Sequence, residues 1–205
     1  MNFKKQTQEI VGSKYRYALF YNFPRGLRFE LSIGTSPLDQ ALTALRRATV
    51  VCDDVFAGEE HVLVHLESYA PPSPFALRPM LRKFQVAGIF VPKIRDIWLD
   101  DDDQTDDDDD GSASFVSCAF KVPATKMQNL LWCAIASDLG PLRPKPCCRV
   151  YLLNINKGIV VHPYDDRGMD VISQSTTTLT GLYERHHDWL LNHDIDAMRK
   201  TVART

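Results

Sequence analysis

Apolar and polar residues alternate strictly from Leu27 to Ile33, which predicts a half-buried strand. Leu27, Phe29, Leu31 and Ile33 are expected to face the core. Arg28 and Glu30 fall on the opposite face, together with Ser32. Shorter apolar stretches predict further strands, at 61–66, 94–99, 115–122, 148–155, 159–162 and 169–172.

Apolar residues at helical spacing follow the first strand. Ser36 and Pro37 are expected as the N-cap and first residue of a helix that continues to about Phe56. The residues from Ala124 to Leu139 predict a second strong helix, which Gly140 and Pro141 end. Further helices are expected at 75–86, 175–191 and 194–202.

The order of these elements predicts one α+β domain over residues 1–205. We expect a mostly antiparallel sheet with helices packed on one face. Residues 141–205 would form a strand meander and its helices within the same domain. Two strands, at 94–99 and 115–122, would form a protruding hairpin with an acidic loop at its tip.

The acidic loop accounts for the negative net charge of the chain. The chain has 205 residues, 26 of them acidic and 24 basic, for a net charge of −2. We expect residues 100–112 to be a flexible acidic insertion. Without its aspartates the rest of the chain carries 24 basic and 17 acidic residues, or +7. This aspartate run comprises nine residues: Asp100, Asp101, Asp102, Asp103, Asp106, Asp107, Asp108, Asp109 and Asp110.

Composition narrows the class of protein. Hydrophobic residues make up 44% of the chain, enough for a substantial core. No apolar run approaches the ~20 residues of a membrane helix, and no apolar segment follows Met1–Glu9 as in a signal peptide. We therefore expect a soluble, cytoplasmic protein that does not bind a membrane. Because Lys and Arg are scattered, nucleic acid is an unlikely partner.

Five cysteines are odd in number and lack the spacing of a zinc site. They are expected to be reduced structural thiols, with no metal and no cofactor. The role of the neighbouring Cys147 and Cys148 stays open.

The turn Asp165-Asp166-Arg167-Gly168 is a candidate for chemistry. Two carboxylates could hold Mg²⁺ or serve in acid–base catalysis. The same residues are also typical of a hairpin turn in which Asp accepts backbone bonds and Arg neutralises it, and we favour that structural interpretation. Arg28 and Glu30 are most simply a surface ion pair, or else part of a polar site on an open sheet face.

Two longer motifs resemble a known family. The first is Tyr21-Asn22-Phe23-Pro24-Arg25-Gly26-Leu27-Arg28-Phe29-Glu30-Leu31. The second runs from Tyr164 to Asp170 and is followed by Leu182-Tyr183-Glu184 and Asp188-Trp189-Leu190-Leu191. Together they resemble the bacterial DUF3885 family, a domain of unknown function. The resemblance implies a bacterial cytoplasmic protein and brings no activity with it; the aspartate run lies outside the pattern.

These features favour a non-catalytic protein-binding protein over an enzyme. Its most specific form is an immunity protein that neutralises a bacterial toxin. A nuclease-type toxin would be basic because it binds phosphate, and an arm of aspartates would attract it. We assign no catalytic residue. The expected contact residues are the nine aspartates of the run together with Arg28, Glu30, Asp165, Asp166 and Arg167.

Two alternatives remain. The first is a metal-dependent enzyme that uses Asp165, Asp166 and Arg167 with Arg28 and Glu30. It requires these groups to converge in one pocket. The second is nucleic-acid binding by the basic remainder of the chain, with the aspartate run as an internal competitor.

Overall fold

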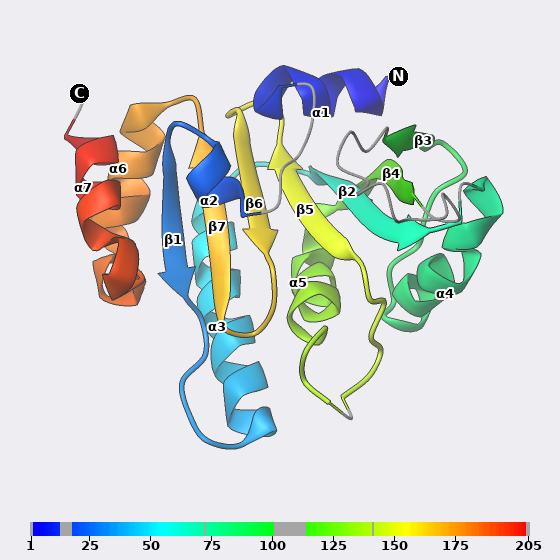
Figure 1. Cartoon of the computed structure of the whole chain (residues 1–205), viewed down its shortest axis with the longest axis horizontal. Coiled ribbons are helices and arrows are strands. Elements are labelled where there is room, and N and C mark those ends of the chain that lie inside the picture. The colour runs from blue at the N-terminus through cyan, green and yellow to red at the C-terminus, as the bar shows by residue number, and fades with distance from the viewer. Residues whose placement is uncertain (1, 13–17, 72, 101–113, 141, 204–205) are drawn as a thin grey trace, which may run out of the picture.

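The centre of the molecule is one twisted antiparallel sheet (Figure 1). The computed structural model describes residues 2–12, 18–71, 73–100, 114–140 and 142–203. Within them the strand order is β1-β7-β6-β5-β2-β4-β3, and every neighbouring pair is antiparallel. The strands are β1 (Gly26–Glu30), β2 (His61–Ala70), β3 (Asp96–Asp100), β4 (Ser114–Pro123), β5 (Arg149–Asn154), β6 (Ile159–Pro163) and β7 (Gly168–Ser173).

Most helices form where apolar residues recur at helical spacing. As expected, the Ser36 side chain caps one helix by accepting from the Asp39 N–H, and Pro37 occupies its first position. The helices are α1 (Phe3–Val11), α2 (Leu19–Asn22), α3 (Pro37–Val55), α4 (Arg78–Val86), α5 (Met127–Ile135), α6 (Thr176–Arg185) and α7 (Ile195–Val202). Short 3₁₀ turns are η1 (Pro74–Leu77), η2 (Ala124–Lys126), η3 (His187–Trp189) and η4 (Asn192–Asp194).

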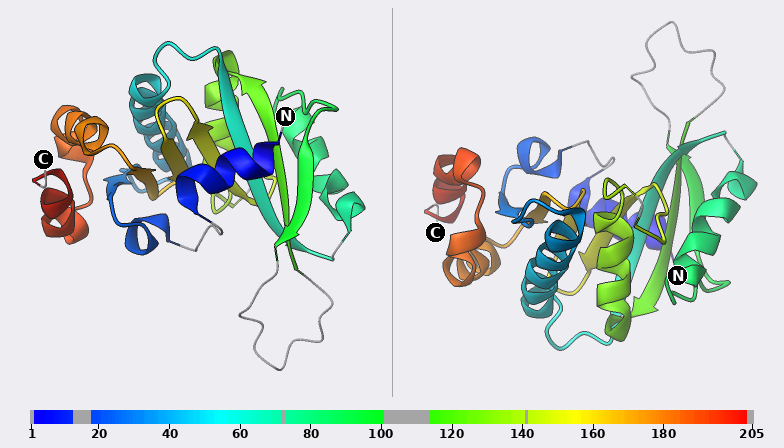
Figure 2. Two further views of the ribbon diagram at one scale, coloured as in Figure 1. Left: turned by 90° about the horizontal axis from the view of Figure 1, so that it is seen from above. Right: turned by 90° about the horizontal axis from the view of Figure 1, so that it is seen from below.

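The main core lies between one face of the sheet and helices α3 to α7. Leu27 and Phe29 of β1 and Leu31 just after it contribute to this core, as the alternation predicts, and all three are buried. Figure 2 shows α3 and α5 side by side across the middle of this face. The expected α+β fold with a mostly antiparallel sheet is confirmed.

The opposite face of the sheet carries two short helices that the sequence analysis did not predict. Phe3 and Ile10 of α1 and Leu19 of α2 pack with apolar residues of β2, β5 and β6 in a second, smaller core. Helices therefore cover both faces. The missed signal is the spacing of the buried residues Phe3, Thr7 and Ile10, which share one side of α1.

Several elements begin or end at other residues than expected; three cases show the range of differences. β1 ends at Glu30, so that Ile33 lies in the following loop with 56% of its surface exposed. β2 continues to Ala70, four residues beyond the end expected at Leu66. The helix expected over 175–191 ends at Arg185 and continues as the 3₁₀ turn η3.

The hairpin that flanks the aspartate run is present. β3 pairs with β4 in antiparallel register, and Asp100 lies opposite Phe115. The remaining aspartates, Asp101 to Asp110, and with them nearly all of the acidic insertion expected at 100–112, lie outside the described residues. β3 is an edge strand of the sheet, at the side opposite β1.

Candidate functional site

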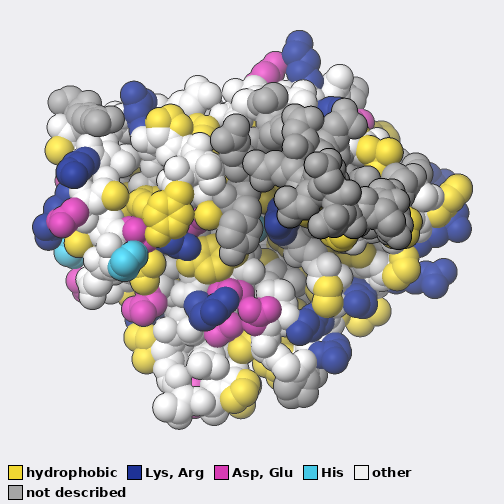
Figure 3. All heavy atoms as spheres, in the orientation of Figure 1, with side chains coloured by type: hydrophobic (Ala, Val, Ile, Leu, Met, Phe, Trp, Pro, Cys, Tyr) yellow, Lys and Arg dark blue, Asp and Glu magenta, His cyan; other side chains and the backbone are white. Residues whose placement is uncertain are grey.

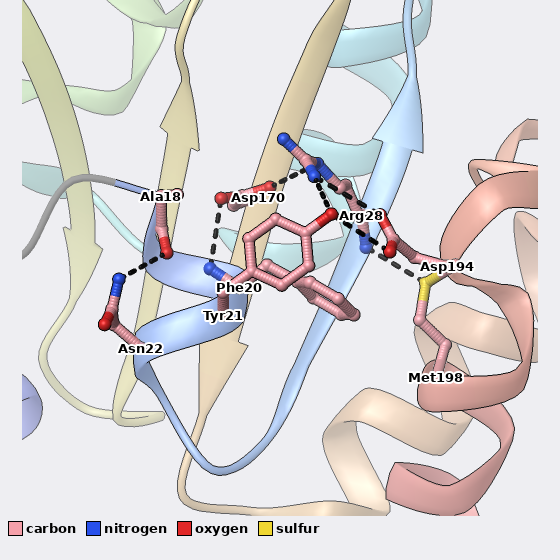
Figure 4. Close-up of polar contacts among 8 residues, drawn as sticks. All are labelled: Ala18, Phe20, Tyr21, Asn22, Arg28, Asp170, Asp194 and Met198. Atoms are coloured by element: carbon pink, nitrogen blue, oxygen red, sulfur yellow. Dashed lines mark hydrogen bonds and ion pairs between the residues drawn. The ribbon is translucent and has the colours of Figure 1, made fainter.

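The candidate site at the β1 edge is centred on the side chain of Arg28 (Figure 4). Its guanidinium donates to the Tyr21 hydroxyl at 2.7 Å and to Asp194 at 3.2 Å. The Arg28 Nε lies 3.4 Å from an oxygen of Asp170, which stands directly opposite Arg28 on β7. The Tyr21 hydroxyl in turn donates to Asp194 at 3.0 Å. One arginine thus links β1 to β7, to α2 and to the turn before α7.

Two aromatic rings enclose the same guanidinium. The carbon at its centre lies 5.0 Å from the ring centroid of Tyr21 and 5.3 Å from that of Tyr164. Only 17% of the Arg28 side chain is exposed. We call Arg28, Tyr21, Tyr164, Asp170 and Asp194 the arginine cluster. Its charged groups are already engaged with one another, which indicates a structural joint rather than an open anion site.

Burial dominates the electrostatics of this cluster. Asp170 is fully buried, and its burial raises the pKa of the carboxyl to about 6, although the Phe20 N–H and Arg28 oppose this shift. The pKa of Arg28 is also raised, because Tyr164, Asp170 and Asp194 favour its charged form more than burial disfavours it. Near neutral pH Asp170 and Arg28 therefore form a buried, mutually dependent ion pair.

The Asp165-Asp166-Arg167 turn lies beside the arginine cluster, at the start of β7. Asp165 accepts from the Arg167 N–H at 2.8 Å and from the Arg167 Nε at 2.9 Å. Burial and the neighbouring Asp165 raise the pKa of Asp166. The turn thus has the local bonds of the favoured structural interpretation, with the Arg167 side chain neutralising Asp165.

Gly168 connects this turn to the arginine cluster. A Cβ at this position would overlap the hydroxyl of Tyr164 and approach the Phe29 carbonyl oxygen. The missing side chain therefore allows Tyr164 to lie against the backbone and its ring to reach Arg28.

Glu30 does not belong to the arginine cluster. The expected ion pair between Arg28 and Glu30 is wrong, because the Arg28 charge is directed to Asp170 and Asp194. Glu30 is exposed, and its carboxylate instead favours the charge of Arg47, whose side chain donates to the Glu30 carbonyl at 2.8 Å. Arg28 and Glu30 thus share one face of the strand but interact with different residues.

A row of buried polar and aromatic side chains crosses the sheet from the arginine cluster. His162 is the β6 neighbour of Asp170, and its ring stacks on Tyr151 of β5 at 4.3 Å between centroids. Tyr151 stacks on His65 of β2, and His65 stacks on Trp98 of β3. We call His162, Tyr151, His65 and Trp98 the polar row.

Both histidines of the polar row are held neutral. Burial lowers the pKa of His65 to about 3 and that of His162 to about 4. His65 Nε2 lies 2.9 Å from the Ser117 hydroxyl, and His162 Nδ1 donates to the Val150 carbonyl at 2.9 Å. These bonds fix the positions of the two rings and favour one arrangement of the side chains in the second core.

The predicted contact residues do not form one surface. Arg28, Glu30 and the turn 165–167 lie at the β1 edge, whereas the aspartate run follows β3 at the other edge. Six strand spacings separate the two edges, about 29 Å. The convergence that the enzyme hypothesis requires is limited to Arg28 and the turn. Within the described ranges, no three His, Cys, Asp or Glu side chains are grouped so that they could hold a metal ion.

The described cysteines are all free thiols, and three of them are buried. Burial raises the pKa of Cys118 and of Cys133 to about 12, which keeps them protonated. Cys147 is exposed, and both it and Cys148 precede β5 rather than opening it. Among the helices of the described segments, none combines the length and apolarity needed to cross a membrane.

Comparison with known proteins places the chain in a family. The family model described as "Domain of unknown function (DUF3885)" matches residues 3–194, and the chain therefore belongs to that family. The description names no activity. The match spans both the arginine cluster and the hairpin strands β3 and β4.

One curated relative is similar over a short stretch. The "Uncharacterized protein YnaE" of Bacillus subtilis (strain 168) is 44% identical over 41 residues. These residues cover 20% of this chain and 19% of the relative, so the similarity is limited to about a fifth of each. No solved structure matches.

Proposed function

Starting from membership in the DUF3885 family, we propose that this chain is a non-catalytic protein-binding protein, and specifically an immunity protein that neutralises a toxin. The observation that supports this proposal is the position of the aspartate run. Nine aspartates and no Lys or Arg lie between Asp100 and Asp110. The chain leaves the sheet after β3 and re-enters it in β4, the neighbouring strand, so the two strands that flank the run lie together at one edge of the sheet.

The partner in this proposal is a basic toxin domain, such as a nuclease. An enzyme that binds nucleic acid needs Lys and Arg around its substrate groove to contact phosphate. Nine carboxylates on one short segment would accelerate encounter with such a groove and could occupy it. Inhibition would then follow from competition for the groove, without a reaction in the immunity protein.

Ion pairs within the protein reduce the number of predicted residues that are available to contact a partner. Arg28, Asp165 and Arg167 have their charges engaged by neighbours within the protein. We therefore assign these residues to the scaffold and place the contact with a basic partner at the aspartate run. Glu30 is exposed but lies at the far edge of the sheet.

The test uses three full-length proteins: wild type, a variant with the nine aspartates changed to asparagine, and a matched control with the nine changed to glutamate. Each is used for affinity capture from the native lysate, followed by mass spectrometry. We expect one stoichiometric basic protein with wild type and with the glutamate control, and its loss with the asparagine variant.

The captured protein is then purified and its activity is titrated with each of the three proteins. Equimolar wild type should abolish the activity, and higher salt should slow the association. Capture by the asparagine variant, or a partner that stays active in equimolar wild type, would contradict the proposal.

A further inference from the structure

A shallow groove lies on the helix-covered side of the sheet, where α3, α4 and α5 meet. Its volume is about 320 Å³. Asn129 of α5 donates to the Ala87 carbonyl just after α4 at 2.7 Å, so two walls of the groove are tied together. We call this site the helix groove; it is lined by Leu45, Val86, Ala87, Gln128, Asn129, Trp132 and Pro144.

Five of the seven residues that line the helix groove have apolar side chains, and some of these side chains face solvent. Val86, the last residue of α4, has 76% of its surface exposed. Leu42 precedes Leu45 by three residues, on the same side of α3, and is 57% exposed. Exposed apolar side chains beside a half-buried Trp are typical of a protein contact surface.

Two of the three walls of the groove belong to segments that are rich in basic residues. Two segments, 68–95 and 121–149, provide α4, α5 and the connector after α5, and together they contain ten Lys and Arg but only one acidic residue, Asp138. Figure 3 views the molecule from the opposite side of the sheet, and dark blue side chains are also frequent on its right-hand side, the side of α4. The ten basic residues are Arg78, Arg82, Lys83, Lys93, Arg95, Lys121, Lys126, Arg143, Lys145 and Arg149.

Basic residues also stand next to the lining residues themselves. Arg46 follows Leu45, and Lys83 lies one helical turn before Val86; both are exposed. Arg143 and Lys145 flank Pro144. Each wall of an apolar groove thus has a cationic neighbour.

We propose that the helix groove binds an acidic segment of a partner protein that inserts an apolar side chain between α3, α4 and α5. The apolar lining would bury that side chain, and the surrounding Lys and Arg would attract carboxylates on either side of it. The amides of Gln128 and Asn129 offer hydrogen bonds to the segment's backbone. This surface is distinct from the aspartate run and selects the opposite charge, so it adds a second contact to a binding protein.

A polypeptide suits the groove better than nucleic acid does. Leu45, Val86, Ala87 and Pro144 are aliphatic, and Trp132 is the one aromatic side chain in the lining. Single-stranded nucleic acid is bound chiefly by stacking successive bases on aromatic rings. The aliphatic lining instead matches a Leu or Ile side chain.

The test measures binding of a defined probe to the full-length chain by fluorescence anisotropy at about 150 mM salt. The probe is a fluorescein-labelled helical peptide of glutamates with a stripe of leucines. Val86→Asp is the disrupting variant, since Val86 is largely exposed and its replacement should leave folding unchanged. Ile33→Asp is the matched control, because it places the same charge at another exposed apolar residue.

We expect Val86→Asp to weaken binding of the leucine peptide at least tenfold and Ile33→Asp to change it less than twofold. A polyglutamate peptide of equal charge should bind wild type at least tenfold more weakly than the leucine peptide. Equal binding of the two peptides, equal effects of the two variants, or an absence of binding would overturn the proposal.

Two further measurements identify the occupant. A single-stranded oligonucleotide that binds more tightly than the leucine peptide, with the same dependence on Val86, would overturn the polypeptide assignment, as would dimerisation of wild type that Val86→Asp abolishes. The variant with nine asparagines should still bind the peptide at least as tightly as wild type. A negative result for the helix groove can therefore be distinguished from a negative result for the aspartate run, because the two tests change different residues.

Discussion

The two edges of the sheet differ in how far their charged side chains are buried and paired. At the β1 edge Arg28, Asp170 and Asp194 are largely buried and engaged with one another, and the chain after α6 covers the strand: Leu191 N–H donates to the Arg28 carbonyl at 2.9 Å. At the β3 edge lie exposed basic residues of α4 and the strands that flank nine aspartates. In sequence, Asp165-Asp166-Arg167 and the aspartate run look like similar candidates for binding; in the structure, bonds within the turn engage Asp165 and Arg167 with each other.

This difference assigns a role to each edge. Removing one member of a buried ion pair leaves the other charge buried and uncompensated, which destabilises the fold. Charges left in solvent gain little for the fold and are available to a partner. We therefore expect substitutions at the β1 edge to change unfolding, and substitutions near β3 and α4 to change binding.

The largest effect is expected from Arg28→Met. Removing the guanidinium leaves Asp170 and Asp194 without their cation, and we expect a loss of about 3 kcal/mol in the free energy of unfolding at pH 8, measured in urea. The double variant with Asp170→Asn should lose less, because one buried charge is then removed too. Arg82→Met, at an exposed arginine of α4, is the matched control and should stay within about 0.5 kcal/mol. Equal losses at the two arginines would remove the distinction between the edges.

The second effect concerns pH and the polar row that connects the edges. His65 and His162 have pKa values of about 3 and about 4 when folded, against 6.5 ordinarily, so below pH 6.5 the unfolded chain binds protons that the folded chain does not. The free energy of unfolding should therefore decrease as the pH is lowered, by about 2 kcal/mol per histidine at pH 5. Asp170 acts in the opposite sense: its pKa of about 6 exceeds the ordinary 3.8, and its contribution rises as pH falls through 6.

Urea unfolding of three proteins between pH 7.5 and pH 5 separates these contributions. His162→Gln should flatten the fall in stability relative to wild type. Asp170→Asn should steepen it, because the opposing contribution is lost. Identical pH profiles for all three proteins would show that these groups titrate alike in the folded and unfolded chains.

A smaller effect is expected from Gly168→Ala. The added Cβ overlaps the Tyr164 hydroxyl, so the Tyr164 ring must move away from Arg28. We expect a loss of about 2 kcal/mol, measured by thermal unfolding. Gly181→Ala in α6 is the control; its Cβ meets only the end of the Arg185 side chain, and it should stabilise the protein by about 0.5 kcal/mol. A neutral Gly168→Ala would show that the Tyr164 position is not fixed by this contact.

The smallest effect is expected from deleting Thr105–Asp110. This segment contains no apolar side chain that could join a core. The free energy of unfolding should change by less than about 0.5 kcal/mol, and binding of a basic partner should weaken. A large drop in the melting temperature would mean that the aspartate run supports the fold.

Local patterns allowed much of the fold to be predicted. The alternation from Leu27 to Leu31 and the Ser36-Pro37 helix start depend on neighbouring residues alone, and both are found in the structure. The missed α1 has its signal in Phe3, Thr7 and Ile10, but only three buried residues mark its apolar side. Ile33 continued the alternation although the strand had already ended, because strand ends depend on pairing with β7.

The candidate site was less predictable, because its partners are distant in sequence. Arg28 was identified as a candidate, but Asp194, which it contacts, is 166 positions away, and Tyr21 and Tyr164 were not assigned any role. Only the register that sets Arg28 opposite Asp170 reveals the pair. The helix groove was not predicted for the same reason: its lining residues come from α3, α4, α5 and the connector at Pro144, which are distant in sequence.

The covering of β1 by the C-terminal elements also dictates an order of events while the protein is being made. β1 leaves the ribosome early, but its partner β7 and the residue Asp194 emerge some 150 residues later, about 10–30 s at ordinary translation rates. The β5–β6–β7 meander and the β3–β4 hairpin join neighbours in sequence and can form first. β1 can therefore be inserted only after β7 has emerged, and the arginine cluster can form only once Asp194 is available.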